Sequence, residues 1–422
     1  MTVSAPAGTQ PETHPIQRTP NESGRCVRII RDVAEIEGIR SAWEQWQKHP
    51  NCDIDFYKTI LRERAEILGP QIFVAYRDGR PVAMLVGRLE SKRLAFKLGY
   101  LTVFRPHLKI FTFPLGGLLG DSSPEISKLL VEAVIGSLRN REAHLAFFEP
   151  MDVASAFYQS VLHLPGPLCK DYLHPVQVHR SMELFETADA FLQSLSPKVR
   201  KNLKWQAKKL AADFAEDVRI VQFRGTHEVD ELIATVESIA RHTYQRALGV
   251  GFSNNAEMRA RLHLEAGKGW LRGYVLQLGG KPAAFWLGSL YDCVFHSNFM
   301  GYDPAFGKYS PGMYLVTTVI AELCQAAGQE RPSRIDFGLG DAQYKQVLGT
   351  TAWDESGLTL FAPTMKGVML NAVRTFVGLS DRLAREALGN WQLLGRVRTR
   401  WRQLARKGLE NSGNAESHAP KA

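Results

Sequence analysis

The sequence predicts a mixed α/β protein in which two similar halves follow one another. Strand-like and helix-like runs alternate through most of the 422 residues. The segment GRPVAMLVG at 79–87 returns as GKPAAFWLG at 280–288, with Gly, a basic residue, Pro, Ala and a closing Gly in the same positions. A chain that is 45% hydrophobic can bury sizeable cores, and this composition excludes a disordered, collagenous or disulfide-dependent protein.

The elements expected around each copy also correspond. The β-rich runs QIFVAY and GYVLQL precede the two copies, which predicts a tight hairpin in both. Ser123-Pro124 and Ser310-Pro311 then begin helical runs, with Ser as the N-cap and Pro at the first helical position. The strand-like runs HLAFFEP and SRIDFGLG follow, and a matching segment opens at Tyr158 and at Tyr344. Each half should therefore contain a β-hairpin, a strand, a helix, a strand and a helix.

The expected domains are residues 24–185 and 186–365, with a tail on either side. Residues 1–23 are rich in Pro, Thr and Ser and lack an apolar run, which predicts a disordered tail and not a signal peptide. The five cysteines are widely spaced, which fits a reducing compartment and indicates no metal site. Because no apolar run reaches about 18–20 residues, we expect a cytoplasmic protein.

Most of the net charge of +9 lies in one C-terminal segment. Residues 366–407 hold ten Lys and Arg side chains against two acidic ones, so the remaining chain is nearly neutral and nucleic acid is not the expected partner. Residues 366–422 are predicted to form basic amphipathic helices and a disordered end. The helices either contact an anionic membrane surface, such as the inner face of the cytoplasmic membrane, or pack on the body. Their apolar side chains recur at helical spacing: Met369, Val373, Phe376, Leu383, and farther on Leu394, Val397, Trp401 and Leu404.

Five motifs resemble a known family. They are SPKVRKNLKWQAKKL (196–210), RHTYQRALG (241–249), LGGKPAAFWLG (278–288), GYDPAFGKYSPGMYL (301–315) and DFGLGDAQYK (336–345). Together they resemble the cellulose-biosynthesis (CelD/BcsL) type of GNAT acetyltransferases, which are related to the Fem-type peptidoglycan-bridge transferases. The resemblance spans about residues 25–360. It implies two tandem GNAT-like (acyl-CoA N-acyltransferase) domains, followed by the basic amphipathic tail.

The segment GYDPAFGKYSPG joins a strand to a helix and is the expected acyl-CoA site. Free N–H groups and the positive end of the helix dipole suit the pyrophosphate of coenzyme A, and two glycines would let the backbone approach it. The usual Gln/Arg-x-x-Gly-x-Gly/Ala loop of GNAT proteins is degenerate here, and an ordinary capped helix would also explain the Ser-Pro start. With the resemblance, the expected ligands of acetyl-CoA, or of another acyl-CoA, are Gly307, Lys308, Tyr309, Ser310, Gly312, Met313 and Lys345.

The corresponding junction of the first half carries a different charge. Glu125 stands there in the place of Gly312. A carboxylate about 4 Å from a phosphate would repel it by about 1–4 kcal/mol near a surface. We therefore expect only the second half to bind acyl-CoA, while the first half is structural or helps to bind the acceptor.

The resemblance also implies an acid for the departing thiolate. Tyr344 would supply that proton, because a phenol with a pKa near 10 is protonated at neutral pH. The alternative is an aromatic side chain that packs on the core face of its helix, as expected for Tyr158. Lys345, which is Gln159 in the first half, would bind the pyrophosphate or an anionic acceptor, or else be solvated.

Acyl transfer needs a proton acceptor near the thioester. The candidates are His296, Asp303, Asp336 and Asp341, and His296 and Asp336 are favoured. Asp303 before a proline can equally start a turn, and Asp341 can equally cap a helix.

Two segments are candidates for acceptor binding. The helix at 196–210 carries six positive charges and no acid, so it either guides a phosphate-bearing acceptor or presents a solvated face. Side chains in the segment at 241–249 recur in the family and would shape an acceptor pocket, and the alternative is an isolated polar helix edge. The expected acceptor-binding residues are Arg241, His242, Tyr244, Arg246, Asp303 and Asp341.

The leading hypothesis is an acyl-CoA-dependent acyltransferase. It would move an acetyl or similar group to an amine or hydroxyl of a sugar or amino-sugar acceptor in a polysaccharide or cell-envelope precursor. The second hypothesis is a Fem-like aminoacyltransferase that uses aminoacyl-tRNA and binds RNA in a salt-sensitive way. The third is a non-catalytic accessory of polysaccharide synthesis.

Overall fold

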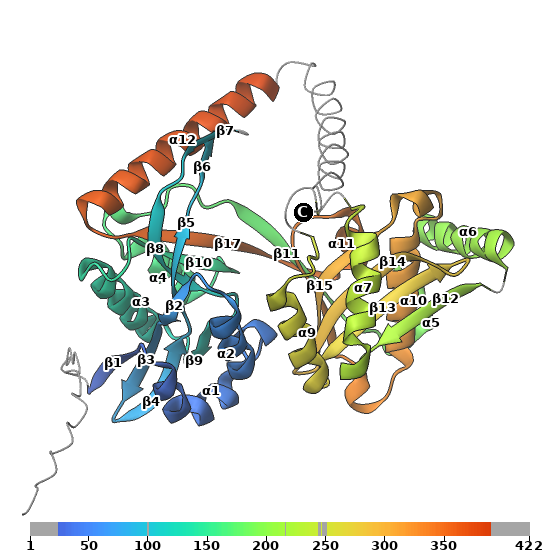
Figure 1. The fold of residues 1–422 in the computed structure, drawn as a ribbon, viewed down its shortest axis with the longest axis horizontal. Coiled ribbons are helices and arrows are strands. Elements are labelled where there is room, and N and C mark those ends of the chain that lie inside the picture. The colour runs from blue at the N-terminus through green and yellow to red at the C-terminus, as the bar shows by residue number, and fades with distance from the viewer. Residues whose placement is uncertain (1–23, 99–100, 216, 244–245, 247–250, 390–422) are drawn as a thin grey trace, which may run out of the picture.

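The computed structural model describes residues 24–98, 101–215, 217–243, 246 and 251–389 (Figure 1). The predicted tail at 1–23 and the segment 390–422 lie outside the described residues. The mixed α/β prediction is confirmed. The two halves lie along the long axis of the molecule, and one sheet of eleven strands runs through both of them.

The first half alternates short strands and helices. Its elements are β1 (Arg25–Ile30), η1 (Val33–Ile39), α1 (Arg40–Trp46), η2 (Pro50–Cys52), α2 (Ile54–Glu63), β2 (Ile67–Pro70), β3 (Ile72–Arg77), β4 (Arg80–Leu85), β5 (Arg88–Arg93), β6 (Phe96–Leu98), β7 (Leu101–Phe104), β8 (His107–Phe113), β9 (Leu118–Gly120), α3 (Pro124–Arg139), β10 (Leu145–Asp152), α4 (Ala156–His163), η3 (Pro167–Cys169) and β11 (Val176–Glu183).

The second half follows the same order after two additional helices. Its elements are α5 (Ala188–Ser194), α6 (Pro197–Phe214), β12 (Val218–Phe223), η4 (Thr226–Glu228), α7 (Val229–Ala240), α9 (Ala256–Gly267), β13 (Leu271–Leu278), β14 (Lys281–Tyr291), β15 (Val294–Tyr302), η5 (Pro304–Tyr309), α10 (Pro311–Gln325), η6 (Gly328–Glu330), β16 (Arg334–Leu339), α11 (Gln343–Leu348) and β17 (Thr351–Phe361), and α12 (Met365–Gly389) ends the described chain.

The two repeated segments form the same hairpin. β3 turns into β4 through two residues with positive φ, and β13 turns into β14 in the same way, as type I′ turns require. Each ladder then shifts its register one step after the repeated proline. Pro81 pairs with Tyr76 before the shift, and Pro282 pairs with Gln277. The repeat in the sequence is therefore a repeat in three dimensions.

The strand that ends each half pairs with the other half. The strand order of the large sheet is β12-β13-β14-β15-β16-β11-β17-β10-β8-β5-β2. β11 comes from the first half of the sequence but lies between β16 and β17, and β17 comes from the second half but lies between β11 and β10. The predicted boundary at 185/186 falls between β11 and α5. The large sheet is thus built from both sequence segments, whereas a separate four-stranded sheet, in the order β1-β3-β4-β9, lies within the first segment.

Both faces of the hairpin strands are covered by helices, because their side chains alternate between two apolar cores. In the first half, Phe73 and Ala75 face α3 and α4, while Ile72 and Val74 face α1 and α2. In the second half, the side chains that alternate along β13 and β14 pack toward α5, α6 and α10 on one face and toward α7 and α9 on the other.

The predicted helix starts are at the expected residues, but the caps differ. α3, α6 and α10 all begin with Pro at the first position, after Ser123, Ser196 and Ser310. Ser196 accepts a hydrogen bond from Val199 N. In the described chain the side chains of Ser123 and Ser310 form no such cap bond.

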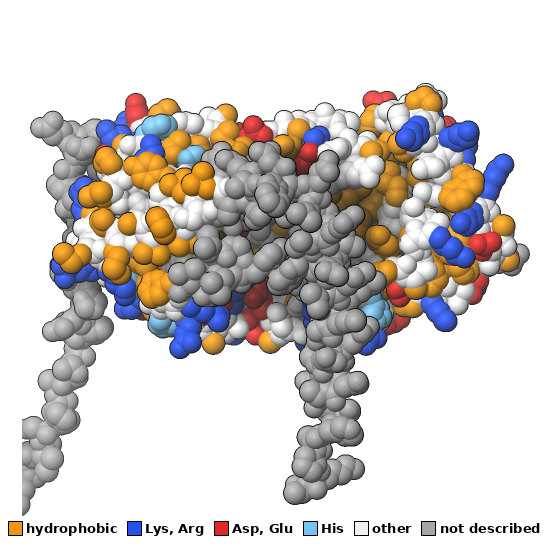
Figure 2. All heavy atoms as spheres, turned by 90° about the horizontal axis from the view of Figure 1, so that it is seen from above, with side chains coloured by type: hydrophobic (Ala, Val, Ile, Leu, Met, Phe, Trp, Pro, Cys, Tyr) orange, Lys and Arg blue, Asp and Glu red, His pale blue; other side chains and the backbone are white. Residues whose placement is uncertain are grey.

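α12 packs only one side against the body. Leu370, Val373 and Val377 are on the inner side, so the predicted placement of Val373 with Met369 and Phe376 is wrong. The outer side carries a row of exposed apolar residues: Met365, Met369, Phe376, Leu379 and Leu383. Seen from above, hydrophobic side chains gather over this end of the molecule (Figure 2). Among the described residues, no helix has the length and apolarity to span a bilayer.

Candidate active site

In the second half, the pairing between two parallel strands ends early. β15 and β16 pair only from Val294 with Arg334 to His296 with Asp336, although β15 continues to Tyr302. Beyond His296 the two strands diverge. β16 also bulges at this point, because its pairing with β11 skips Phe337. A bulge next to a strand end commonly redirects a side chain toward a site.

A buried polar cluster lies where the strands separate. Asp336 Oδ1 is 2.6 Å from His179 Nε2 and accepts a hydrogen bond from Gly338 N at 2.8 Å. Asp336 Oδ2 is 3.6 Å from His296 Nδ1. Glu355 Oε1 lies 3.1 Å from the other ring nitrogen of His179. The cluster therefore joins β15 and β16 to the two exchanged strands, β11 and β17.

The polar neighbours of His179 and Asp336 favour the charged forms of both side chains. Burial alone would lower the pKa of His179, but its interactions with Asp336 and Glu355 raise it to about 9. Burial alone would likewise raise the pKa of Asp336, but the two histidines lower it well below its usual value. Asp336 is thus an ionised anchor that already has three polar neighbours, and it is a weak proton acceptor.

His296 is the better-placed proton acceptor. Its ring is 7% exposed, and Nε2 has no hydrogen-bond partner among the described residues. Its other nitrogen faces Asp336, which can orient the ring. The ring of His49 packs edge-on against His296, with the ring centroids 4.6 Å apart. Burial, and then the proximity of His296, lower the pKa of His49 to about 3, so His49 is neutral at neutral pH.

The corresponding position of the first half is closed by aromatic rings. β8 and β10 are also parallel, and Phe113 with Phe148 is their last pair. These two rings stack with centroids 4.6 Å apart and are almost fully buried. The last pair of parallel strands is therefore a histidine with an aspartate in the second half and two phenylalanines in the first.

The expected acyl-CoA junction is partly open. Ser310 is exposed and adopts a left-handed backbone conformation (φ +50°), and its carbonyl accepts hydrogen bonds from Met313 N and Tyr314 N. A Cβ at Gly312 would meet only Tyr302, at 3.7 Å. Lys308 is exposed above the ring of Tyr309. Tyr309 itself is buried and donates to Asp213 at 2.7 Å, so its side chain ties η5 to α6.

At the corresponding junction of the first half, the start of α3, the negative charge of Glu125 is paired with Arg25. Its carboxylate accepts a hydrogen bond from Arg25 at 2.9 Å and remains exposed. Because Arg25 and Glu125 neutralise each other, this helix start has no excess of positive charge to attract a pyrophosphate.

The two residues predicted on α11 have different environments. Tyr344 is partly buried, and its ring packs edge-on against Phe337 at 6.2 Å. Lys345 is 9% exposed and donates to the carbonyls of Gly338 and Leu339, and burial lowers its pKa to about 8. Gln159 in the first half donates to Val153 O in the same manner. The ammonium group of Lys345 therefore holds the backbone at the end of β16, and the alternative of a solvated side chain is excluded.

The expected acceptor residues lie near the ends of β15 and β16. His242 Nδ1 is 3.9 Å from Asp303, which caps η5 through Ala305 N. Arg246 pairs with Glu237, and Asp341 pairs with Arg180. Arg241 is exposed at the end of α7, and Tyr244 lies outside the described residues. Four of these side chains, His242, Asp303, Arg246 and Asp341, therefore already have ionic partners within the protein.

Comparison with known proteins places the second half in a family. Residues 197–346, about a third of the chain, match the model of an acetyltransferase (GNAT) domain. These residues form a GNAT domain. Together with the structural repeat, this gives two tandem GNAT-like domains, and the protein is an acyltransferase. No curated protein sequence matches the chain.

Several solved structures are similar to most of the chain. FemX is 11% identical with a TM-score of 0.48, covering 76% of this chain and 95% of FemX. The C-terminal domain of a putative lysylphosphatidylglycerol synthetase from Agrobacterium fabrum is 10% identical with a TM-score of 0.46, covering 82% and 96%. A tandem GNAT protein from the clavulanic acid biosynthesis pathway is 11% identical with a TM-score of 0.45, covering 80% and 99%. At these values no statement about the activity of this chain follows from them.

Sequence reasoning missed three residues of the GNAT domain's polar cluster. His49, His179 and Glu355 lie outside residues 197–346, on segments that reach β15 and β16 only through the fold. An available signal was the occurrence of His179 in an otherwise strand-like run, VQVHRSME. In the described residues, no group of three or more His, Cys, Asp or Glu side chains is arranged to hold a metal ion.

Proposed function

We propose that the second half transfers an acyl group, preferably acetyl, from acyl-CoA to an amine or hydroxyl of a polysaccharide or cell-envelope precursor with a sugar or amino-sugar acceptor group. The observation that carries the site is the end of pairing between β15 and β16 at His296, whose buried Nε2 has no hydrogen-bond partner among the described residues. The acceptor class rests on the resemblance to the cellulose-biosynthesis type of GNAT enzymes. The first half does not share the reaction, because the stacked rings of Phe113 and Phe148 occupy the position that His296 and Asp336 have in the second half.

The reaction would need only positioning and two proton transfers. The pantetheine arm would lie between the diverging strands, with the pyrophosphate near Ser310 and Gly312. His296 would take a proton from the acceptor through Nε2 while Asp336 orients the ring. The acceptor atom bonds to the acyl carbon, the carbon–sulfur bond breaks, and the coenzyme A thiolate leaves with a proton from Tyr344.

The charge of the α10 junction tests this proposal. We expect Gly312→Glu to lower acetyl-CoA affinity at least about tenfold, because the new carboxylate would repel the pyrophosphate. The position accepts a Cβ, so the fold should persist. Isothermal titration calorimetry with acetyl-CoA, longer acyl-CoAs and free coenzyme A measures the effect.

Gly312→Ala is the matched control, and it should bind acetyl-CoA nearly as the natural protein does. Equal affinity of the Glu and Ala variants would remove the junction from the binding site. A natural protein that binds no acyl-CoA, but binds aminoacyl-tRNA with strong salt dependence, would establish the Fem-like alternative instead.

We also propose that the C-terminal segment brings the enzyme to an anionic membrane surface on the cytoplasmic side. Support comes from the exposed apolar row on α12 and from the basic residues that follow it in the sequence. The same apolar spacing continues through Leu394, Val397, Trp401 and Leu404, which lie outside the described residues. Each Lys or Arg near such a surface contributes about 1 kcal/mol.

A further inference from the structure

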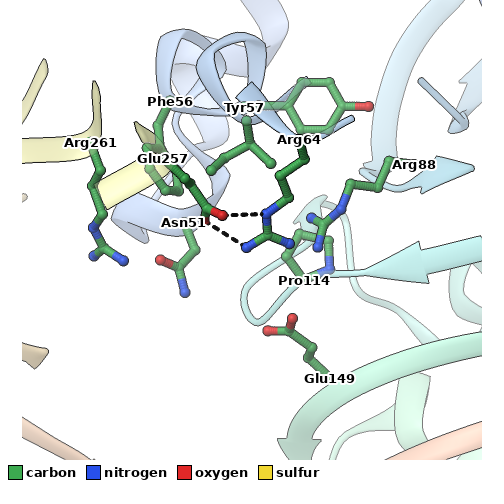
Figure 3. A pocket seen from close by; sticks show the side chains of 10 residues that line it. Asn51, Phe56, Tyr57, Arg64, Arg88, Pro114, Glu149, Glu257 and Arg261 are labelled. Atoms are coloured by element: carbon green, nitrogen blue, oxygen red, sulfur yellow. Dashed lines mark hydrogen bonds and ion pairs between the residues drawn. The ribbon is translucent and has the colours of Figure 1, made fainter. Parts of the chain in front are cut away.

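A small cavity lies between the two halves, and none of the residues that line it belongs to β15 or β16 (Figure 3). Its volume is about 130 Å³. The first half supplies most of its wall, including the apolar side chains of Phe56, Ile60 and Pro114. The second half supplies Glu257 and Arg261 from α9. Asn51 also lines the cavity, two residues after His49, which contacts the active-site His296.

Two arginines of the wall are already engaged. Arg64 forms a two-point hydrogen bond with Glu257, at 2.8 and 2.7 Å, and this pair joins the halves (Figure 3). Arg261 pairs with Glu265 at 2.7 Å and lies over the ring of Phe56. These contacts shape the cavity, and their charges are neutralised inside the protein.

Two further groups face the cavity with opposite, unjoined charges. Arg88 is 7% exposed and forms an ion pair with Glu90 through Nε. Glu90 also pairs with Lys92, so one carboxylate serves two cations, and the end of the Arg88 guanidinium group points into the cavity (Figure 3). Glu149 also points into it, and its carboxylate accepts one hydrogen bond, from Leu115 N at 3.1 Å. No cation of the described chain lies within ion-pair distance of Glu149. A positive and a negative group therefore border one cavity without meeting.

The backbone is shaped to present Glu149. The pairing of β10 with β17 shifts between Phe148 and Met151, so Glu149 lies in a bulge directly after the closed strand pair of the first half. Bulges redirect side chains and are frequent beside binding sites. A regular strand would continue the pleat and place this carboxylate elsewhere.

We propose that this cavity binds a small zwitterion of the α-amino-acid class. Its ammonium group pairs with Glu149, and its carboxylate pairs with Arg88. Partly buried charges are costly unless they are paired, and a ligand with both signs satisfies the two walls at once. The volume equals about four water molecules at roughly 30 Å³ each, which suits glycine, alanine or serine. This binding does not depend on acyl transfer, because Glu149 and Arg88 both belong to the first half.

Titration calorimetry on the full chain tests the site with glycine, L-alanine and L-serine. The comparison probes are propionate, which lacks the ammonium group, and ethylamine, which lacks the carboxylate. We expect L-alanine to bind roughly ten- to a hundredfold more tightly than either probe, because each loses one charge-assisted interaction. Equal affinity for L-alanine, propionate and ethylamine would overturn the proposal. So would the absence of binding by glycine, L-alanine and L-serine.

Glu149→Gln removes the charge and keeps the acceptor for Leu115 N. It should weaken L-alanine binding by the same ten- to hundredfold while acetyl-CoA binding is unchanged. The matched control is Glu132→Gln on the exposed side of α3, which should leave L-alanine binding unaltered. L-Alanine affinity that is the same in both variants would show that Glu149 is not part of a ligand site. Loss of acetyl-CoA binding alone bears on the proposed function and not on this cavity.

Discussion

At the scale of single residues, His296 and Asp336 have different hydrogen-bonding environments although they are adjacent. Asp336 is held by His179, Gly338 and His296, so its geometry is complete before any substrate arrives. His296 keeps one ring nitrogen without a partner among the described residues. A ring that is oriented through one nitrogen and has no partner at the other is suited to proton transfer.

His296→Gln is expected to lower kcat/KM about 10²- to 10⁴-fold, because the proton acceptor is removed. Affinity for acetyl-CoA and the melting temperature should change little. Steady-state kinetics and calorimetry measure these quantities, with His263→Gln on the exposed side of α9 as the control. Activity within twofold of the natural protein would exclude His296 as the base.

His179 predicts a pH dependence of stability. Its folded-state pKa of about 9 is above the ordinary value of 6.5, so the protonated ring stabilises the fold fully below about pH 6.5. This stabilisation should be lost as the pH rises through 9. Urea unfolding at pH 6.5 and 9 should show a fall in the free energy of unfolding that His179→Gln lacks. The same fall in both proteins would contradict the assignment.

At the scale of elements, α12 has two apolar sides with different surroundings. One side covers the strands around Leu108 and Phe361 through Leu370 and Val373. The other side leaves Phe376 and Leu383 largely exposed. Periodicity identified the helix, but it could not separate the two sides because apolar residues occupy both.

Exposed side chains on α12 can be replaced without disturbing the core. In the full chain, Phe376→Asp together with Leu383→Asp should reduce flotation with anionic liposomes at least about tenfold, since two apolar contacts with the membrane are lost. Leu68→Asp, an exposed leucine on β2, is the control. Unchanged flotation of the double variant would end the membrane proposal for α12.

At the scale of the whole molecule, the exchange of β11 and β17 makes the halves interdependent. Leu358 and Leu360 of β17 belong to the core of the first half, and Met182 of β11 belongs to that of the second. The same exchange brings the ring of His179 to Asp336 and the buried carboxylate of Glu355 to that ring. The GNAT domain therefore depends on the sequence that precedes it.

We expect the fragment 186–365 alone to lack a cooperative thermal transition, because β16 has lost β11 and β17 has lost β10. Co-expression with residues 24–185 should restore a soluble complex. Size-exclusion chromatography and differential scanning calorimetry compare the two samples. A cooperative transition in the isolated fragment would show that the exchange is dispensable.

The sequence by itself determined the repeated hairpins and the starts of α3, α6 and α10. Their signals are local: turn residues with positive φ, Ser-Pro pairs and side chains that alternate between two faces. The sequence also proposed His296 and Asp336 together, and the structure places them side by side on adjacent strands. The role of Lys345 needed the structure, because only the fold places its ammonium group at the carbonyls of Gly338 and Leu339.

Only the tertiary structure decided which strands complete each sheet. Backbone N–H and C=O groups form the strand ladders, and they are the same in every residue, so a central strand such as β11 carries no mark of its neighbour. That choice of neighbours brought His179 and Glu355 to Asp336 and set Glu149 opposite Arg88. The polar chemistry of this protein therefore follows from pairing between distant segments, whereas its elements follow from local sequence.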